Sequence, residues 1–369
     1  MIKVLHVVSA LDGGGVENLL LNYYNYMDKK KIKFDFIVHG NNKGALEPIF
    51  ENLNSKIYHI PSKHDSVIQN FKCLKEIIYN GNYDIVHAHL GIMSVFPVYY
   101  AKKAGVAIRI AHSHTAFITK SISNRLIHNI LRPFLKRNAN YWFACSEDAG
   151  EFLWGSDAVT CGRVHIMKNA IDINKFTFNP EVRNKIRNVL GVEGKFVIGS
   201  VGRFTYSKNH KFLIQIFNEI YNKNRDATLI LIGNGELEDE IKKQIISLGL
   251  KDVVICLGVR DDVHELLQAM DVFLLPTRYE GFGIVYIEAQ TAGLMTFGSE
   301  KVVPSEVKIT DLMKFISLNN SPESWCKEIL GYNNGYKRVD TSKYIKENGY
   351  DIQLEANKLE KFYYKSLTN

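Results

Sequence analysis

Residues 202–209 combine two cations in one short loop, with a spacing suited to binding a diphosphate. The segment reads Gly-Arg-Phe-Thr-Tyr-Ser-Lys-Asn and contains Arg203 and Lys208. A guanidinium offers a forked pair of donors and an ammonium offers a compact charge, so both can neutralise one anionic group. Two solvated surface cations are the alternative. Because the segment follows a strand-like run, we expect phosphate binding.

Residues 280–288 place two carboxylates on either side of a glycine-containing loop. The segment reads Glu-Gly-Phe-Gly-Ile-Val-Tyr-Ile-Glu. Glu280 and Glu288 can accept hydrogen bonds from hydroxyl groups on two different parts of one ligand. The free amides of Gly283 and Ile284, at the start of a predicted helix, would face phosphates between those parts. Ordinary surface glutamates are the alternative, but they would not explain the Gly-x-Gly.

Residues 12–17, which read Asp-Gly-Gly-Gly-Val-Glu, form a third such segment between the first strand-like run and a helical pattern. Glycines let the backbone approach a ligand closely, and a helix N-terminus attracts anions. The segment is not a dinucleotide-binding fingerprint, because Asn18 stands where the last glycine would be. A tight turn without a ligand is the alternative.

Histidines gather at the ends of two strand-like runs, with His87 and His89 on one and His112 and His114 on the next. Such a group can bind a metal, form structural hydrogen bonds or line a ligand cleft. No carboxylate or cysteine cluster accompanies it, and the five scattered cysteines show no Cys-x-x-Cys spacing. We therefore expect no metal site and no cofactor, but at least one histidine with a functional role.

Composition indicates a globular protein with more than one domain. The chain has 369 residues, of which 46% are apolar and 23% charged, and this balance excludes disorder. Its net charge of +7 suits phosphate-rich ligands, nucleic acid or an anionic membrane. The chain contains no nucleic-acid recognition motif, so we expect no nucleic-acid partner.

A basic amphipathic helix is predicted for residues 122–139, and it carries Arg125, Arg132, Lys136 and Arg137. Its outer face is either simply solvated or binds an anionic membrane surface. The first residues show neither a signal peptide nor a spanning segment. We expect a cytoplasmic protein and leave peripheral attachment to the inner face of the plasma membrane open.

Short β-branched runs alternate with helical patterns along the chain, which indicates βαβ units and parallel sheets. A first set of strands is predicted at 2–9, 34–39, 56–60, 84–89, 108–112, 141–145 and 164–167. A second set is predicted at 196–202, 227–232, 253–257, 271–275 and 295–297. Ligands of such sheets bind beyond the carboxyl ends of the strands, which is where the segments described above lie.

A polar stretch at residues 172–194 separates the two sets of strands. We therefore predict an N-terminal domain at 1–175 and a second domain at 176–345. The last segment, 346–369, belongs to a helical pattern that runs from Tyr344 to Leu367 and can pack back on the first domain.

Taken together, these segments resemble the retaining glycosyltransferases of family GT4, in the branch that assembles capsular polysaccharides and exopolysaccharides. The resemblance covers nearly the whole chain and rests on residues 13–17, 112–115, 146–147, 169–172, 202–210, 233–235 and 280–288. It implies the GT-B fold, an α/β architecture of two Rossmann-like, doubly wound domains that face each other across a cleft. The first domain would bind the acceptor and the second the nucleotide-sugar. Residues 169–172 match an Asn-Gly-x-Asp turn of the family, except that Ala170 stands where many relatives have glycine.

The resemblance also implies four catalytic residues. Arg203 and Lys208 would neutralise the diphosphate of the donor. Glu280 would contact the transferred sugar, and His114 would lie beside it.

Further donor-binding residues are implied in both domains. In the first domain the backbone of Gly14 and Gly15 would approach the diphosphate. In the second domain Glu288 would hold the ribose hydroxyls. The backbone around residues 259–260 would face the nucleobase, and the loop at 281–284 would complete the site. These last two groups comprise Val259, Arg260, Gly281, Phe282, Gly283 and Ile284.

The implied reaction moves a hexose or N-acetylhexosamine from a nucleotide-sugar, with uridine diphosphate as the commonest carrier in the family, to a saccharide or lipid-linked saccharide. The family implies retention of configuration without a metal, because fixed cations stabilise the departing diphosphate. Two other functions stay open: a nucleotide-sugar 2-epimerase and a non-catalytic sugar-nucleotide-binding partner subunit. The epimerase would not be expected to combine Arg203 and Lys208 with residues 280–288. The partner subunit would not need intact Arg203, Lys208 and Glu280.

Overall fold

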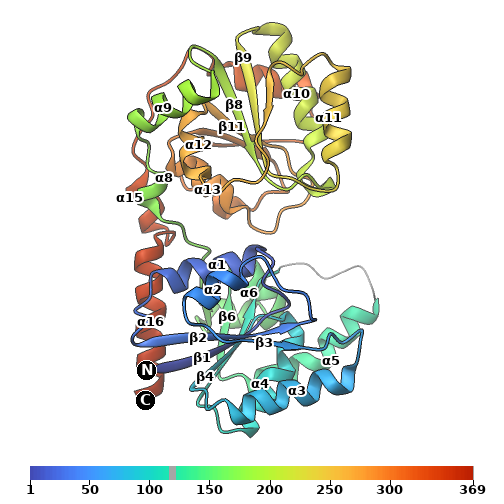
Figure 1. Ribbon diagram of the computed structural model, residues 1–369, viewed down its shortest axis with the longest axis vertical. Helices are drawn as coiled ribbons and strands as arrows, with labels where there is room; N and C mark the ends of the chain where they lie inside the picture. The colour runs from blue at the N-terminus through green and yellow to red at the C-terminus, as the bar shows by residue number, and fades with distance from the viewer. Residues whose placement is uncertain (116–121, 369) are drawn as a thin grey trace. The chain divides into compact units, whose positions relative to one another are not determined.

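The computed structural model describes residues 1–115 and 122–368 and divides the chain into two compact units (Figure 1). Unit 1 comprises Met1–Ala170 and the described residues from Asp351 onward, and unit 2 comprises Ile171–Tyr350. The division after Ala170 lies slightly before the expected end of the first domain at residue 175. The chain returns to unit 1 after Tyr350, whereas we expected the last segment to begin at residue 346.

Unit 1 is built on a parallel sheet of seven strands in the order β3-β2-β1-β4-β5-β6-β7. Each strand predicted in the first half of the sequence is present. Most residues of these strands are apolar and buried, as expected for strands that are covered on both faces. The strands are β1 (Ile2–Val7), β2 (Ile32–His39), β3 (Ile57–Ile60), β4 (Ile85–Ala88), β5 (Ile108–Ser113), β6 (Tyr141–Ala144) and β7 (Val164–Ile166).

Helices cover both faces of this sheet. One core contains side chains of α1 (Gly15–Asn25), α2 (Glu47–Asn52) and α16 (Ile352–Thr368). The other contains side chains of α3 (Val67–Asn80), α4 (Val95–Lys103), α5 (Ile122–Asn138) and α6 (Glu147–Trp154). Figure 1 shows α3, α4 and α5 side by side. The short elements η1 (Gly91–Ser94) and α7 (Ser156–Thr160) complete the described part of the unit.

Unit 2 has a parallel sheet of six strands in the order β10-β9-β8-β11-β12-β13. Its strands are β8 (Phe196–Val201), β9 (Ala227–Ile232), β10 (Val254–Cys256), β11 (Val272–Leu275), β12 (Met295–Ser299) and β13 (Met313–Ile316). We did not predict the edge strand β13, because it is short and interrupted by Lys314. Thr296 pairs in register with Met313, which places β13 beside β12.

The helices of unit 2 also form two layers. One core contains side chains of α8 (Ile173–Phe176), α9 (Pro180–Leu190), α12 (Val263–Ala269), α13 (Ile284–Thr291) and α15 (Ser342–Glu347). The opposite core contains side chains of α10 (His210–Lys223), α11 (Glu238–Ser247) and α14 (Pro322–Leu330). The short elements η2 (Tyr206–Lys208) and η3 (Ser305–Val307) lie in loops.

The helical pattern from Tyr344 to Leu367 forms two helices rather than one. The chain breaks between α15 and α16 at Gly349, whose φ of 78° is left-handed and ends the first helix. Helix α15 packs in unit 2, whereas α16 packs against α1 in unit 1. The last helix therefore belongs to the core of the first unit.

Each sheet has one place where the strand order reverses, between β1 and β4 in unit 1 and between β8 and β11 in unit 2. Loops that leave the carboxyl ends of two such strands diverge to opposite faces of the sheet and leave a crevice where ligands bind. The segments at residues 12–17, 202–209 and 280–288 follow three of these strands, β1, β8 and β11.

Replacing Leu359 with alanine should destabilise unit 1, because this side chain of α16 lies in the unit 1 core and is only 6% exposed. We expect a loss of about 2–3 kcal/mol, the usual cost of deleting a buried leucine side chain. Chemical denaturation followed by far-UV circular dichroism measures it. Leu354→Ala is the matched control, since Leu354 is 41% exposed on the same helix. Equal losses in the two variants would show that α16 is not part of the unit 1 core.

Candidate functional site

An ion pair joins the two loops at the reversal point of unit 2. The ammonium Nζ of Lys208, in the loop after β8, donates to Oε2 of Glu280, in the loop after β11, at 2.6 Å. The exposed fractions of the two side chains are 21% and 9%. Two residues predicted from separate parts of the sequence are therefore in direct contact.

Neighbouring polar residues hold the two loops together. Asn209, which has a left-handed φ of 58°, donates through its amide to the carbonyl of Pro276 and accepts from Nε of Arg278 at 2.9 Å. The Arg278 guanidinium also donates to the Tyr206 hydroxyl, and its backbone amide donates to the carbonyl of Ser207. Sequence reasoning missed Asn209 and Arg278 as positioning residues. The only signal was a polar residue directly before a helix and a second cation near Glu280.

The loop after β9 supports Arg203. The amide of Phe204 donates to the carbonyl of Asn234 at 2.7 Å, so the two loops run against each other. Gly233 has a φ of 131°, and a Cβ atom there would lie 2.2 Å from the carbonyl oxygen of Gly202. Only glycine fits this contact. The Arg203 side chain is exposed and forms no ion pair with any described residue.

The start of α13 brings backbone amides to the same edge of the sheet. Gly283 precedes the helix with a φ of 84°, a conformation that a residue with a side chain rarely adopts. Gly281 is exposed, whereas Phe282 is half-buried and stacks on Tyr350. The amides that begin a helix lack partners within it and are free to bind an anion.

Glu288 lies further along α13 and is partly buried. Burial raises the pKa of Glu288 to about 7, because the charged carboxylate is poorly solvated there. This carboxyl group therefore changes its charge near neutral pH. Ile284, at the first position of the helix, is half-buried.

The loop after β10 lies at the same edge of the sheet. Gly258 accepts a hydrogen bond from the amide of Gly233 at 2.8 Å, which links this loop to the one after β9. Val259 is 71% exposed, and the Arg260 guanidinium donates to both carboxylate oxygens of Asp262. The side chain of Arg260 is therefore paired with a neighbour, although both residues are exposed.

In unit 1 the glycine segment forms the N-terminus of α1. Gly14 is the N-cap, and a Cβ atom there would lie 2.4 Å from a carboxylate oxygen of Glu17. Burial raises the pKa of Glu17, while hydrogen bonds from the backbone at Glu17 and Gly14 act in the opposite direction. The Glu17 carboxylate thus lies over the helix N-terminus, beside Gly14 and Gly15, in a position that suits an anion.

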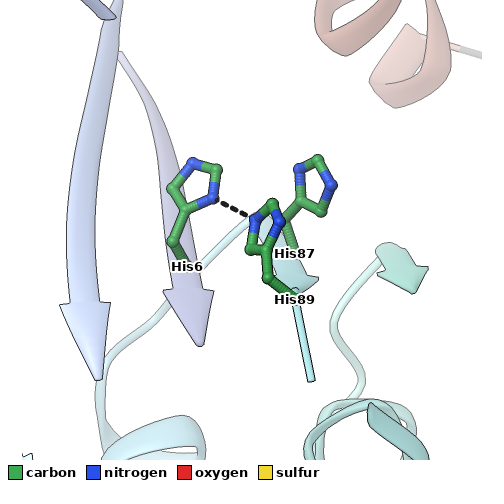
Figure 2. A group of neighbouring side chains, drawn as sticks. All are labelled: His6, His87 and His89. Atoms are coloured by element: carbon green, nitrogen blue, oxygen red, sulfur yellow. Dashed lines mark hydrogen bonds between the residues drawn. The ribbon is translucent and has the colours of Figure 1, made fainter. Parts of the chain in front are cut away.

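The histidines of unit 1 form chains of ring-to-ring hydrogen bonds. His6 Nδ1 lies 2.9 Å from His89 Nε2, and His89 Nδ1 lies 2.9 Å from His114 Nε2. The dashed line in Figure 2 marks the first of these hydrogen bonds. In a second chain, His87 lies 3.2 Å from both His112 Nδ1 and the Tyr363 hydroxyl of α16. His6 was not predicted. Its only signal was a polar side chain within an apolar strand.

These imidazoles are neutral at physiological pH. Burial lowers the pKa of His6 and of His114 to about 3. Burial also lowers the pKa of His87, His89 and His112 well below the usual value, and the neighbouring rings lower it further. Because a neutral ring carries one N–H, each link in a chain needs a donor on one ring and a lone pair on the next.

The geometry of these rings would also allow metal binding. Ring nitrogens of His6, His87 and His89 lie within 4.8 Å of one another, and so do those of His89, His112 and His114. Neutral imidazole is the form that binds metal. The 2.9 Å links between rings are, however, ordinary hydrogen-bond distances that need no ion.

Comparison with known proteins identifies the family. EpsF, a glycosyltransferase of Bacillus subtilis, is 32% identical over 370 residues, which covers 97% of this chain and 95% of EpsF. The pattern of the family "Glycosyltransferase Family 4" matches residues 13–175, and that of "Glycosyl transferases group 1" matches residues 182–351. The chain belongs to the family 4, group 1 glycosyltransferases. The predicted family and enzyme class are confirmed.

Other relatives extend the comparison for this glycosyltransferase. An Escherichia coli enzyme named "UDP-Gal:alpha-D-GlcNAc-diphosphoundecaprenol alpha-1,3-galactosyltransferase" is 24% identical over 93% of this chain and 96% of its own. The crystal structure of Anabaena HepE in complex with UDP superposes with a TM-score of 0.78 at 19% identity, over 98% of this chain and 99% of HepE. A glycosyltransferase structure from Rickettsia africae gives 0.79 at 20% identity, over 100% of this chain and 99% of that one. These structures confirm the predicted GT-B fold.

The predicted site residues of this glycosyltransferase gather in two groups. The structure brings together Lys208, Glu280 and the loops that carry the other residues of unit 2, and it places His114 in unit 1 in contact with His89. Their individual roles stay predictions. Within residues 1–115 and 122–368, no helix is long and apolar enough to cross a membrane.

Glu288→Gln should alter how stability depends on pH. Because the pKa is raised to about 7 in the folded state, folding favours the protonated carboxyl group, and that contribution is lost as the pH rises through 7. The variant should therefore match the wild type near pH 5 and be more stable near pH 8, by on the order of 2 kcal/mol. Urea unfolding at both pH values measures the difference. Exposed Glu236→Gln is the control, and an identical pH profile in all three proteins would contradict the raised pKa.

The histidines of the two chains should remain uncharged in mildly acidic solution. We expect the rings of His6 and His114 to stay in the neutral form, with one N–H each, down to about pH 4, because their pKa is lowered to about 3. Nitrogen-15 NMR of histidine-labelled protein measures this directly. His59 is the internal control, because the Gly40 carbonyl and then the Glu47 carboxylate raise its pKa. Titration of His114 near pH 6 would contradict the buried chain.

Proposed function

We propose that this enzyme is a retaining, metal-independent glycosyltransferase that moves a hexose or N-acetylhexosamine from a UDP-sugar to a saccharide or lipid-linked saccharide in surface polysaccharide assembly. The observation that carries the proposal is the contact of Lys208 with Glu280 at the reversal point of the unit 2 sheet. An acceptor-binding unit 1 and a donor-binding unit 2 are part of the proposal. UDP in the HepE complex and the diphosphoundecaprenol acceptor in the name of the Escherichia coli relative support it.

The residues of unit 2 suit the charge changes of this reaction. As the bond between the anomeric carbon and the diphosphate oxygen breaks, negative charge grows on the departing UDP. Lys208, Arg203 and the amides at the start of α13 would stabilise that charge from fixed positions. The acceptor hydroxyl attacks the anomeric carbon from the face that UDP leaves, and its proton passes to the departing phosphate.

In this proposal the two carboxylates bind different parts of the donor. Glu280 would bind hydroxyls of the transferred sugar, and its contact with Lys208 would hold that sugar beside the diphosphate. Glu288 would accept hydrogen bonds from the ribose. The ionised form is the better acceptor, so donor affinity should rise as Glu288 loses its proton near pH 7. From unit 1, His114 would lie beside the sugar, and Gly15 would offer its amide to the diphosphate.

We propose no metal and no other cofactor in this reaction. The fixed cations Arg203 and Lys208 supply the positive charge that a metal would otherwise supply. Glycosyl transfer in the presence of excess EDTA tests this, because undiminished transfer is expected and loss that added divalent metal restores would contradict it.

Lys208→Ala should lower glycosyl transfer by at least about 100-fold, which is the usual cost of removing one group that stabilises a developing oxyanion. Lys211→Ala is the matched control, because Lys211 lies nearby on α10 but pairs with Glu240 at the surface. Product formation from UDP-sugars measures transfer. A thermal shift with UDP, GDP and ADP tests donor class in parallel. Near-normal transfer by Lys208→Ala would remove this residue from the mechanism.

We also propose that α5 places unit 1 on an anionic membrane surface. Four large apolar side chains of this helix are exposed by 45–59%: Leu126, Ile127, Ile130 and Phe134. They form one stripe, since residues spaced by three and four lie on one face of a helix. Arg125 and Arg137 on the same helix are exposed as well. An apolar stripe with cations around it is typical of helices that lie in a membrane interface.

Ile130→Ser should reduce sedimentation of the protein with phosphatidylglycerol vesicles, because it removes an apolar group from the centre of the stripe. We expect a loss of about fivefold or more in partitioning, given the transfer free energy of a large aliphatic side chain. Val189→Ser is the control, because Val189 is 71% exposed on α9 of unit 2. High salt should weaken binding of the wild type. Absence of wild-type binding at low salt would contradict membrane attachment.

A further inference from the structure

A hollow beside α5 is lined by several positively charged side chains and lies at the opposite end of the strands from the histidines. It has a volume of about 700 Å³, and Arg132, Lys136 and Arg163 line it together with two tryptophans. Lys136 and Arg132 come from the second half of α5, and Arg163 comes directly before β7. Trp142 stands near the start of β6, so the hollow lies at the amino end of these strands. The histidines His112 and His114 lie at the opposite, carboxyl end of the neighbouring β5.

The three cations outnumber the acidic groups that line the hollow. No ion pair joins any of them to a described residue, and the buried Nε of Arg132 has no hydrogen-bond partner. Asp157 is the one carboxylate among the lining residues. Burial and then the charge of Arg132 lower the pKa of Lys136, and Asp157 offsets this only in part. The hollow therefore carries excess positive charge, which an anion would neutralise.

Two stacked indole rings form an apolar wall of the hollow. The rings of Trp142 and Trp154 lie 4.9 Å apart and parallel. Lys136 and Arg163 each approach the Trp142 ring, at 5.4 and 5.3 Å from its centre. These cation–π contacts hold both side chains at the hollow without using up their hydrogen-bond donors. Arg132 is held against Gly155, where a Cβ atom would lie 2.7 Å from its guanidinium.

The position on α5 indicates the source of the anion. Asn129, Arg132, Pro133 and Lys136 line the hollow from one side of this helix, and the exposed apolar stripe lies on the adjacent side. A membrane that takes up the stripe would bring its headgroups to the level of the hollow. A guanidinium pairs with a phosphate through two parallel hydrogen bonds, and Arg132 and Arg163 both offer that geometry.

We propose that this hollow binds the phosphate group of an anionic phospholipid headgroup through the side chains of Arg132, Lys136 and Arg163. The inference deepens the proposed membrane attachment and rests on it. It adds a specific site to what would otherwise be a general attraction between a basic helix and an anionic surface. The site is separate from the proposed donor-binding residues, which lie in the loops and helices that follow the carboxyl ends of the strands.

Arg163→Gln and Arg137→Gln make the matched comparison. Both remove one exposed arginine from unit 1, but Arg163 lines the hollow, whereas Arg137 lies on α5 outside it. Sedimentation of the full chain with phosphatidylglycerol vesicles measures binding. A general attraction predicts that Arg137→Gln loses as much binding as Arg163→Gln or more. The headgroup site predicts a loss for Arg163→Gln that is at least about fivefold greater, as expected for a charge-assisted hydrogen bond.

Glycerol 1-phosphate provides the second arm, with tryptophan fluorescence as the readout because Trp142 lines the hollow. It should change the fluorescence of the wild type and compete with vesicles, and Arg163→Gln should weaken both effects. Equal vesicle binding by the two variants would overturn the proposal. A fluorescence response to glycerol 1-phosphate or inorganic phosphate without competition against vesicles would also overturn it, in favour of a site for free anions.

The donor assay separates this proposal from the proposed enzymatic function. Both variants should keep the thermal shift with UDP that the wild type shows, since neither residue belongs to unit 2. Loss of vesicle binding with an unchanged UDP shift supports the headgroup site. A wild type that binds vesicles but never responds to UDP would count against the donor assignment alone.

Discussion

A buried ion pair is costly unless its surroundings hold both charges in place, and the contact between Lys208 and Glu280 meets this condition through the loops around it. Both side chains are largely withdrawn from water, so each has lost hydration that the other must replace. Asn209 and Arg278 tie the two loops together through side-chain hydrogen bonds. Removing one partner would leave an unpaired charge, whereas a diphosphate could compete for the ammonium. The pair is thus suited to open toward an anionic ligand.

The parallel sheets make this arrangement possible. In each unit all strands are parallel, so their carboxyl ends lie on the same side of the sheet. Loops that are distant in sequence therefore meet there. The loops after β8, β9, β10 and β11 contact one another through backbone hydrogen bonds such as those between Gly233 and Gly258. Gly233 allows the loops after β8 and β9 to approach each other closely, because a side chain there would clash with Gly202. Lys208 and Glu280 therefore meet at the carboxyl ends of the unit 2 strands.

Much of the fold and of the site could be predicted from the sequence, because most strands are short segments rich in β-branched and other apolar residues, and the charged segments follow them in the sequence. Strand β13 escaped prediction because Lys314 interrupts a run of only four residues, and the break before α16 escaped because helical periodicity continues on both sides of Gly349. Arg203, Lys208, Glu280 and Glu288 carry their chemistry in their residue types.

Positioning residues were harder to find, since their role depends on partners that only the folded chain brings together. Asn209 and Arg278 are ordinary polar residues until their loops meet. His6 is separated from His89 by 83 residues, yet the neighbouring strands β1 and β4 place the two rings in contact. The same holds for Arg132, Lys136 and Arg163, which the sequence shows only as scattered basic residues. Their shared hollow is a property of the tertiary structure.

The side chains at the carboxyl ends and at the amino ends of the unit 1 strands differ in charge. At the carboxyl ends of the strands, burial lowers the pKa of His6 and His114 to about 3, so these rings add no positive charge there. Because His6, His89 and His114 are neutral and linked nitrogen to nitrogen, the position of the proton on one ring determines its position on the others. At the amino ends of the strands, Lys136 and Arg163 lie against the Trp142 ring, which brings no opposite charge to them. The cations of the hollow and the neutral histidines therefore lie at opposite ends of the strands in unit 1.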